Sequence, residues 1–312
     1  MKKISILIPC YNEVENVVPM SEAVQQIMRE QLSMYDYELI FIDNCSKDGT
    51  RERLRDICRL NPKVKAILNA KNFGQFNSPF YGLCQTSGDC AIGMCADFQD
   101  PVEMIPQFVA EWEKGSKIVC GIKATSREKK IIRAFRTLYY KMIKKFSDVE
   151  QIEHFTGFGL YDKSFIGTLR DLHDPTPFLR GIVAELGPER KEIPYEQQRR
   201  RAGKTHNNLF TLYDAAMLSF TSYTKIGLRL ALFGGFLLAA LSILAAIVYL
   251  VLKLVWWDTF SAGSTPILLA VLVLGSVQLF FIGLVGEYVM SMNLRIMNRP
   301  LVVEEERINF DY

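Results

Sequence analysis

The sequence lacks the usual marks of several protein classes. It has only three histidines in 312 residues, and none of its seven cysteines forms a Cys-x-x-Cys pair, so no zinc site is indicated. Basic residues number 37 and acidic residues 34, so net charge alone indicates no class of partner; we expect no nucleic-acid partner. No internal repeat or low-complexity segment is present. The N-terminal apolar run ISILIP is too short for a signal peptide and is typical of a strand.

Charge is also missing from two long stretches. No charged residue occurs in the 23 residues from Leu230 to Leu252 or in the 28 residues from Thr259 to Gly286. At ~1.5 Å per residue the shorter stretch forms a helix of about 34 Å, enough to cross a hydrocarbon core of ~30 Å. A pair of buried helices in a soluble protein is the alternative, but such length is unusual there. We therefore predict two transmembrane helices, at about 229–252 and 265–288.

Basic residues flank these stretches on one side. Lys225 and Arg229 precede the first, Arg295 and Arg299 follow the second, and the connecting loop has a single lysine. The positive-inside rule then predicts a multi-pass protein of the inner (plasma) membrane with its N-terminal domain and both termini in the cytoplasm. All seven cysteines precede residue 121 and so belong to the part assigned to the cytoplasm. Because the cytoplasm is reducing, we expect their thiols to be reduced.

The first 120 residues alternate short apolar runs with helical stretches. The runs are ISILIP, YELIFID, VKAILNA, CAIGMCA and SKIVCGI, and helices are predicted at Val14 to Glu30 and Thr50 to Leu60. This alternation favours an α/β domain with a mostly parallel sheet covered on both faces. Polar clusters follow the first four runs: PCYNE, DNCSKDGT, KNFGQ and ADFQD. Because such sheets bind ligands beyond the carboxyl ends of their strands, these clusters form the candidate site.

Two amphipathic stretches accompany the predicted spans. Residues 127–146 carry apolar side chains at helical spacing on one face and seven lysines and arginines on the other. This pattern is typical of a helix in the membrane interface, although a helix packed on the domain would share it. The predicted organisation is a domain at 1–208 that includes this interface helix, a juxtamembrane helix at 209–225, the two transmembrane helices within 226–292, and a cytoplasmic tail at 293–312.

The stretch GDCAIGMCADFQDPVE runs from an apolar segment directly into two carboxylates. Asp100 followed by Pro101 is the pattern of a helix N-cap with proline in the first helical position. A cap explains Asp100 but leaves Asp97 and Gln99 without a role.

With these clusters in this order, the chain resembles family 2 glycosyltransferases, and more closely the polyisoprenyl-phosphate glycosyltransferases. The matching stretches cover nearly the whole chain: ISILIPCYNEVENV, FIDNCSKDGT, KNFGQ, ADFQDPVEMIP, RRAGKTH and GLVGEYV. Any one of these stretches alone is common in proteins. The resemblance therefore rests on the occurrence of all of them in the same order along the chain. The resemblance implies a GT-A fold, which is a Rossmann-like α/β domain with a mostly parallel sheet, here followed by interface and transmembrane helices.

The resemblance also implies roles for individual residues. The positions that match those holding the nucleotide sugar are Pro9, Tyr11, Glu13, Asp43, Lys71, Asp97, Arg200 and Lys204. For Pro9 and Tyr11 an ordinary strand-end turn is the alternative. Asp97 and Gln99 fall where the family coordinates a divalent cation, and oxygen ligands suit Mg²⁺ or Mn²⁺. That metal would neutralise the leaving diphosphate.

Three positions depart from the family pattern. Cys95 replaces the first aspartate of the family's metal-binding motif. The family's DDGS motif is here Asp43-Asn44-Cys45-Ser46. The family's GDFRL motif is here TGFGL, in which Gly157 replaces a carboxylate. A thiol is a poor ligand for Mg²⁺, so we expect weaker metal binding or replacement by Asp100 or water. Asp162 is the nearest remaining acid and a candidate catalytic residue, with a helix cap as the alternative.

A missing base does not prevent the implied reaction. A lipid phosphate has a second pKa of ~6, so its oxygen is already largely anionic at neutral pH. The site instead needs positive charge at the leaving group. Arg200 of the RRAG element is the candidate, although a solvated basic loop near anionic lipid would look the same. With Asp97 and Asp162 it completes the set of candidate catalytic residues.

The predicted function is inverting transfer of a hexosyl unit from a UDP-glucose-like or GDP-mannose-like donor to undecaprenyl or another polyprenyl phosphate. The reaction is placed at the cytoplasmic membrane face, and a flippase and a second transferase would act afterwards. The resemblance is compatible with a homo-oligomer. One alternative is a processive polysaccharide synthase subunit, although the tryptophan of its Gln-x-x-Arg-Trp element is absent after Arg200. The other is a non-catalytic nucleotide-sugar-binding membrane protein, which Cys95 and Gly157 would suit.

Overall fold

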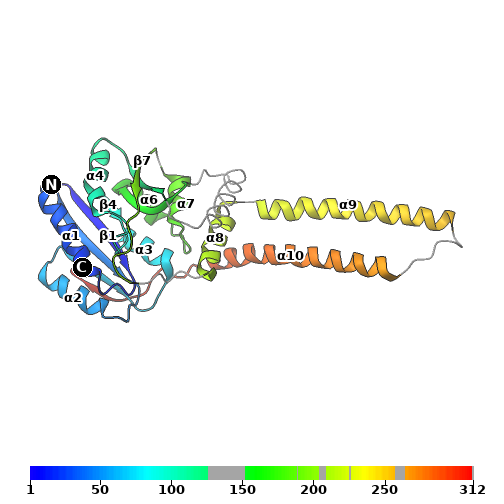
Figure 1. Ribbon diagram of the computed structural model, residues 1–312, viewed down its shortest axis with the longest axis horizontal. Coiled ribbons are helices and arrows are strands. Elements are labelled where there is room, and N and C mark those ends of the chain that lie inside the picture. The colour runs from blue at the N-terminus through cyan, green and yellow to red at the C-terminus, as the bar shows by residue number, and fades with distance from the viewer. Residues whose placement is uncertain (126–151, 188, 204–208, 225, 257–263, 311–312) are drawn as a thin grey trace.

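The computed structural model describes residues 1–125, 152–187, 189–203, 209–224, 226–256 and 264–310. The predicted interface helix at 127–146 and Lys204 lie outside these residues. The structure combines a sheet domain with two long helices that run side by side away from it (Figure 1).

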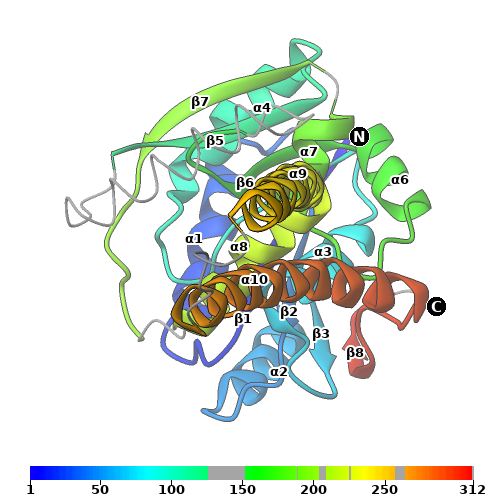
Figure 2. The same cartoon turned by 90° about the vertical axis from the view of Figure 1, so that its right-hand side faces the viewer.

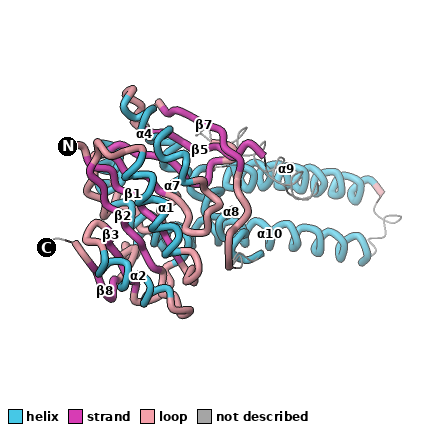
Figure 3. Tube along the Cα trace, turned by 60° about the vertical axis from the view of Figure 1, so that its left-hand side comes forward, coloured by secondary structure: helices cyan, strands magenta, loops and turns pink. Residues whose placement is uncertain are grey.

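A single eight-stranded sheet forms the centre of the domain (Figure 3). Its strands, in the order in which they lie in the sheet, are β7 (Arg190–Glu196), β5 (Ile118–Thr125), β6 (Phe155–Asp162), β4 (Cys90–Gly93), β1 (Lys3–Cys10), β2 (Asp36–Asp43), β3 (Val64–Asn69) and β8 (Glu304–Ile308). Strands β4, β1, β2 and β3 pair in parallel. The predicted fold class, α/β with a mostly parallel sheet, is therefore confirmed.

The fifth predicted strand takes a different place from the first four. β5 pairs in parallel only with β7, because β6 lies between β5 and β4 and is antiparallel to both. The first four predicted strands thus form the parallel block, and β5 lies outside it. Strands β6, β7 and β8 were not predicted from the sequence.

Two apolar clusters bury the two faces of the sheet, because alternate side chains of each strand point to opposite faces. On one face, α1 (Val17–Glu30), α2 (Thr50–Leu60) and α4 (Ile105–Glu113) pack against residues such as Ile6 and Phe41. On the other, α3 (Gly74–Cys84), α6 (Lys163–Asp171) and α7 (Leu179–Leu186) pack against residues such as Leu7 and Ile40. The predicted helices at 14–30 and 50–60 correspond to α1 and α2.

The chain leaves the domain through α8 (Leu209–Tyr223) and enters α9 (Ile226–Val255), followed by α10 (Ser264–Ile296). Helix α8 lies where the helix pair meets the sheet domain (Figure 1), and Figure 2 shows it behind α9. Two segments are long and apolar enough to cross a membrane, Leu228–Tyr249 and Val273–Ile296. Helix α10 itself contains the whole of the predicted span at 265–288. Side chains along both segments are largely exposed, which disfavours the soluble-core alternative.

Two tyrosines connect α8 with α10 at the domain end. Tyr288 donates a hydrogen bond to the carbonyl of Thr224 at 3.0 Å, and Tyr213 donates to Glu287 at 2.9 Å. Beyond α10 the chain returns to the domain and forms β8, which pairs antiparallel with β3. The predicted C-terminal tail thus contains a strand of the central sheet.

Candidate active site

The loops that follow β1 and β2 are bonded to each other at the carboxyl edge of the sheet. The backbone N–H groups of Asn12 and Glu13 donate to Ser46 Oγ at 2.7 Å and to Thr50 Oγ1 at 2.9 Å. In return, Lys47 N–H donates to Asn12 Oδ1 at 2.9 Å. These bonds hold the PCYNE and DNCSKDGT clusters together as one surface.

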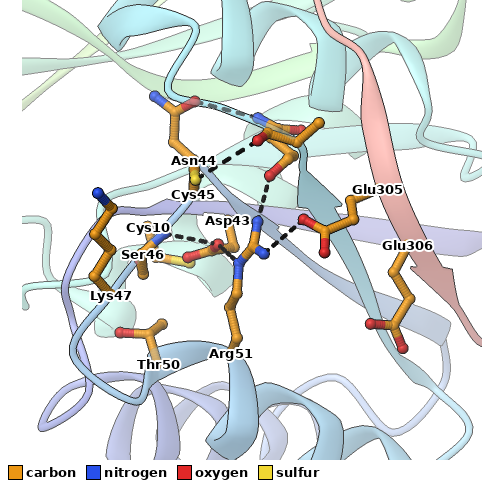
Figure 4. A network of polar contacts seen from close by, with 12 residues as sticks. Cys10, Asp43, Asn44, Cys45, Ser46, Lys47, Thr50, Arg51, Glu305 and Glu306 are labelled. Atoms are coloured by element: carbon orange, nitrogen blue, oxygen red, sulfur yellow. Dashed lines mark hydrogen bonds and ion pairs between the residues drawn. The ribbon is translucent and has the colours of Figure 1, made fainter.

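Asp43 ends β2 inside this surface and is completely buried. Its Oδ2 accepts hydrogen bonds from Ser46 N–H at 3.1 Å and from Arg51 Nε at 2.8 Å (Figure 4). Its Oδ1 is also buried, yet it has no hydrogen-bond partner among the described residues. Because a buried acceptor without a donor is costly, this oxygen is a candidate to accept from a ligand group that displaces the atoms now covering it.

Asn44 explains one departure from the family pattern. Its Nδ2 donates to Asn72 Oδ1 at 2.8 Å and to the carbonyl of Gly74 at 3.1 Å, and its Oδ1 accepts from Phe73 N–H at 2.9 Å. A carboxylate could accept but could not donate, so an amide at this position holds the KNFGQ loop in a way that aspartate would not. Lys71 of that loop lies over the ring of Phe73, 5.1 Å from its centroid.

The acidic cluster after β4 meets the basic loop after β7. Arg200 Nη2 lies 2.9 Å from Asp97 Oδ2, and its Nη1 lies 3.8 Å from Glu13 Oε1. Asp97 is 4% exposed. Three predicted site residues from distant parts of the chain are thus brought into one ionic cluster, in which one guanidinium faces two carboxylates.

Backbone contacts fix the relative position of these two loops. Arg201 N–H donates to the carbonyl of Asp97 at 3.1 Å, and Gln198 N–H donates to the carbonyl of Gln99 at 3.2 Å. The side chain of Gln197 adds a bond from Nε2 to Gln99 Oε1 at 2.8 Å. Arg200 is therefore held beside Asp97 by hydrogen bonds between the two loops as well as by the attraction of opposite charges.

Asp100 does not cap a helix, so the sequence interpretation of this residue is wrong. A short 3-10 turn, η1 (Val102–Met104), follows Pro101 and leads into α4 without a side-chain cap. The Asp100 carboxylate instead accepts from Cys95 N–H at 3.0 Å and from Tyr195 Oη at 2.9 Å. Burial raises its pKa. Tyr195 lies in β7, too far along the chain for local spacing to reveal the contact.

The donor set at this edge fits a divalent cation only in part. Both Asp100 oxygens already accept hydrogen bonds within the protein, and replacement of the missing metal aspartate by Asp100 or water stays a prediction. The enclosed thiol of Cys95, beside the carboxylates of Asp100 and Asp97, has a raised pKa although the residue keeps an exposed surface. A thiol is in any case a poor ligand for Mg²⁺, which prefers oxygen. The described residues contain no group of three or more His, Cys, Asp or Glu side chains that could hold a metal ion.

Asp162 lies away from this cluster. It pairs with Cys90, the first residue of β4, whereas Asp97 follows the end of that strand, so the two acids lie at opposite edges of the sheet. Asp162 caps α6 by accepting from Ser164 N–H at 3.0 Å, and it also accepts from Trp112 Nε1 at 2.8 Å. Although burial alone would raise its pKa, these bonds lower it to about 2. The catalytic assignment of Asp162 is therefore corrected to a structural cap.

The remaining predicted residues occupy the same edge as Asp97. Pro9 pairs with Ile42 near the end of β1, and Tyr11 directly follows the strand. These positions fit both a ligand contact and a strand-end turn, so the roles of Pro9, Tyr11 and Lys71 stay predictions. Lys204 lies outside the described residues.

The chain is similar to known glycosyl transferases along almost its whole length. Glycosyl transferase family 2 matches residues 5–173. The SfII prophage-derived bactoprenol glucosyl transferase of Shigella flexneri is 29% identical over 96% of each chain. The bactoprenol glucosyl transferase of Shigella phage SfV is 28% identical over 98% of this chain and 99% of its own. A prophage bactoprenol glucosyl transferase homolog of Escherichia coli K12 is 27% identical over 96% and 97%.

Solved structures resemble the domain more distantly. Glucosyl-3-phosphoglycerate synthase from Mycobacterium tuberculosis, crystallised with Mn²⁺, UDP-glucose and phosphoglyceric acid, is 16% identical, with a TM-score of 0.48 over 70% of this chain and 78% of its own. Mannosyl-3-phosphoglycerate synthase from Rubrobacter xylanophilus has a TM-score of 0.47 at 16% identity over 75% of each chain. These likenesses are too weak to transfer a ligand or a mechanism.

Proposed function

Because the chain belongs to glycosyl transferase family 2, we propose that it transfers one hexosyl unit from a nucleotide-diphospho-sugar to a polyprenyl phosphate such as undecaprenyl phosphate. The proposal depends above all on one observation: the ionic cluster of Arg200, Asp97 and Glu13 belongs to a chain with two helices apolar enough to cross a membrane. Relatives named bactoprenol glucosyl transferase, which align along almost their entire length, support the same acceptor class.

The donor would bind across the loops that follow β1, β2 and β4. Asp43 Oδ1, which has no partner among the described residues, would accept an N–H from the nucleotide base, and because it is buried, the atoms that cover it would have to move for the base to reach it. The guanidinium of Arg200 would bind the diphosphate, because its planar fork can donate two parallel hydrogen bonds to phosphate oxygens. The nucleotide can be UDP or GDP, and the hexose glucose or mannose.

The reaction would need no protein base. A phosphate oxygen of the acceptor is anionic at neutral pH, attacks the anomeric carbon and forms the new C–O bond. The bond from that carbon to the diphosphate oxygen breaks, and its electron pair leaves with the nucleoside diphosphate. Displacement from the opposite side inverts the anomeric configuration. Arg200 would stabilise the negative charge that develops on the leaving oxygen.

A divalent cation would supply further charge neutralisation when bound. Asp97 and Gln99 would hold it, together with oxygens of the donor diphosphate, because Mg²⁺ and Mn²⁺ bind through one or two protein oxygens plus substrate and water. Asp97 faces Arg200 in this structure, so the carboxylate would exchange part of that contact for the metal.

The acceptor would reach the site from the cytoplasmic leaflet of the inner membrane. The sheet domain and β8 lie at one end of the α9–α10 pair, so the N-terminal domain and the C-terminal strand would be on one side of the bilayer (Figure 1). By the positive-inside rule, the basic residues that flank the apolar stretches favour the cytoplasm for that side. The product would then need a flippase and a second transferase.

The decisive experiment combines purified full-length protein, undecaprenyl phosphate and a panel of UDP- and GDP-hexoses, with Mg²⁺ or Mn²⁺ or with chelator. We expect nucleoside diphosphate release that depends on the lipid, with one hexose per lipid in the product. Asp97→Asn and Arg200→Ala should each lower the rate at least a hundredfold, while both variants still insert into membranes.

Other outcomes separate the rival functions. A polymeric product would indicate a processive synthase. Binding of nucleotide sugar without lipid-dependent release, across the whole panel, would indicate a non-catalytic binding protein. Full activity of Asp97→Asn or Arg200→Ala would contradict the assigned roles of those residues.

A further inference from the structure

The C-terminal strand brings acidic side chains to the network around Asp43. β8 pairs with β3 in antiparallel register, with Glu306 opposite Leu68 and Glu304 opposite Asn69. Between them, Glu305 accepts a bond from Arg51 Nη1 at 2.8 Å (Figure 4). The two residues are 254 positions apart, and both predicted membrane spans lie between them in the chain.

Arg51 has a partner on every side of its guanidinium. Nε donates to Asp43 Oδ2 at 2.8 Å, Nη1 donates to Glu305, and Nη2 donates to the backbone carbonyl of Asn69. The Arg51 side chain is 14% exposed. Because the guanidinium is a rigid plane, the contacts on two of its sides determine where the third side points. Glu305 and Asn69 together therefore set the position of Nε.

The direction of Nε determines how the Asp43 carboxylate is turned. Oδ2 is held by Arg51 and by Ser46 N–H, and this leaves Oδ1 buried without a partner among the described residues. If Arg51 moved, Oδ1 could rotate toward another donor and would lose its fixed direction. The geometry points to Glu305 as a positioning residue. We infer that the C-terminal strand forms part of the nucleotide-binding site by orienting Asp43 through Arg51.

The neighbouring residue offers a matched control. Glu306 accepts from Arg55 Nη2 at 2.7 Å and from Arg55 Nε at 3.0 Å, so it also ties β8 to α2. The other ionic partner recorded for Arg55 among the described residues is Glu52, at 3.7 Å, and this pair does not lead to Asp43. Loss of Glu306 thus tests the attachment of the strand alone, whereas loss of Glu305 tests attachment and orientation together.

This inference rests on the nucleotide-binding role proposed for Asp43. The experiment uses full-length protein in detergent and compares Glu305→Ala, Glu305→Gln, Glu306→Ala and Asp43→Asn with the unmodified chain. Calorimetric titration with UDP and with GDP gives Kd, turnover with undecaprenyl phosphate gives KM and kcat for the donor, and thermal unfolding gives Tm.

We expect Glu305→Ala to raise Kd and donor KM about tenfold while kcat stays within twofold, since the missing bond orients the base contact and not the reacting atoms. Glu305→Gln should recover part of the affinity, because its amide oxygen still accepts from Arg51. Glu306→Ala should leave Kd and KM within twofold, with a Tm close to that of Glu305→Ala.

Each contrary result has a distinct meaning. Equal Kd values for Glu305→Ala and Glu306→Ala, with tight binding by the unmodified chain, would overturn the positioning role and leave the proposed function intact. Unchanged binding by Asp43→Asn would remove the base contact on which the inference rests. Failure of the unmodified chain to bind either nucleotide would overturn the proposed function itself.

Discussion

At the scale of single residues, Arg200 and Asp97 form an ion pair within the candidate site. At 2.9 Å each largely cancels the field of the other, and Glu13 adds a second carboxylate at 3.8 Å. A diphosphate can bind only if the guanidinium turns some of its N–H groups away from these acids. The ion pair therefore holds Arg200 in place before the donor binds and must loosen when it does.

Asp162 gives a prediction at the same scale. Asp162→Ala removes the cap of α6 and leaves the buried Trp112 N–H without its acceptor, so we expect the free energy of unfolding to fall by about 1–3 kcal/mol. Turnover per folded molecule should stay within twofold, because Asp162 lies at the edge of the sheet opposite Asp97. Thermal unfolding and lipid-dependent nucleotide release test the two parts.

Asp162→Asn is the control, since asparagine also caps helices and can accept from Trp112. It should restore most of the lost stability. A hundredfold loss of turnover in a well-folded Asp162→Asn protein would return this residue to the catalytic set.

At the scale of elements, the buried carboxylate of Glu38 connects the neighbouring strands β1, β2 and β3. Glu38 of β2 accepts from Ser5 Oγ at 2.6 Å, from Lys65 Nζ at 2.8 Å and from Ser87 N–H at 2.7 Å. Although burial would raise the pKa of Glu38, these bonds lower it to about 2 from an ordinary 4.5. A shift of this size corresponds to ~3 kcal/mol of stability.

The pH dependence of stability follows from the direction of this shift. The folded pKa lies below the unfolded one, so the contribution of Glu38 is complete above about pH 4.5 and is lost as pH falls toward 2. Other carboxylates titrate in the same range, so the useful quantity is the difference from Glu38→Gln. We expect this variant to have a lower Tm at pH 7 and a smaller fall of Tm between pH 4.5 and 2. Parallel Tm curves would contradict the prediction.

The sequence predicts the strands that are buried apolar runs. It misses the strands that are held in place by contacts with distant residues. β1 to β3 are apolar runs and were identified, whereas β8 reads EEERI and is held by pairing with β3 and by ion pairs with Arg51 and Arg55. No local pattern marks so charged a segment as a strand. Likewise, Asp100 next to Pro101 resembles a cap, and only the folded chain brings Tyr195 to it.

The candidate site was predictable only through family motifs. Spacing alone indicated polar clusters at strand ends, and the resemblance singled out Asp43, Asp97 and Arg200. Arg51 was missed because an arginine in the first turn of a helix usually reads as a solvated charge. Its partners, Asp43 and Glu305, come from β2 and from the far end of the chain.

At the scale of the whole molecule, the native cysteines offer a test of orientation. Cys45 is partly exposed and lies in the sheet domain. In a bacterial host, a membrane-impermeant maleimide should label the protein in inverted membrane vesicles and leave it unlabelled in intact spheroplasts. A Cys45→Ser variant should lose most of the signal. Labelling in intact spheroplasts would contradict the cytoplasmic placement of the domain.

The pairing of β8 with β3 attaches the sheet domain to the helix pair at two separate points, through α8 before the helices and through residues 297–303 after them. A domain attached by one linker can rotate and tilt, whereas two attachment points leave little of that freedom. In a bilayer the reactive edge would stand at one height above the headgroups. Acceptors would then be selected by how far their phosphate projects from the surface, and the length of the buried prenyl tail would matter little.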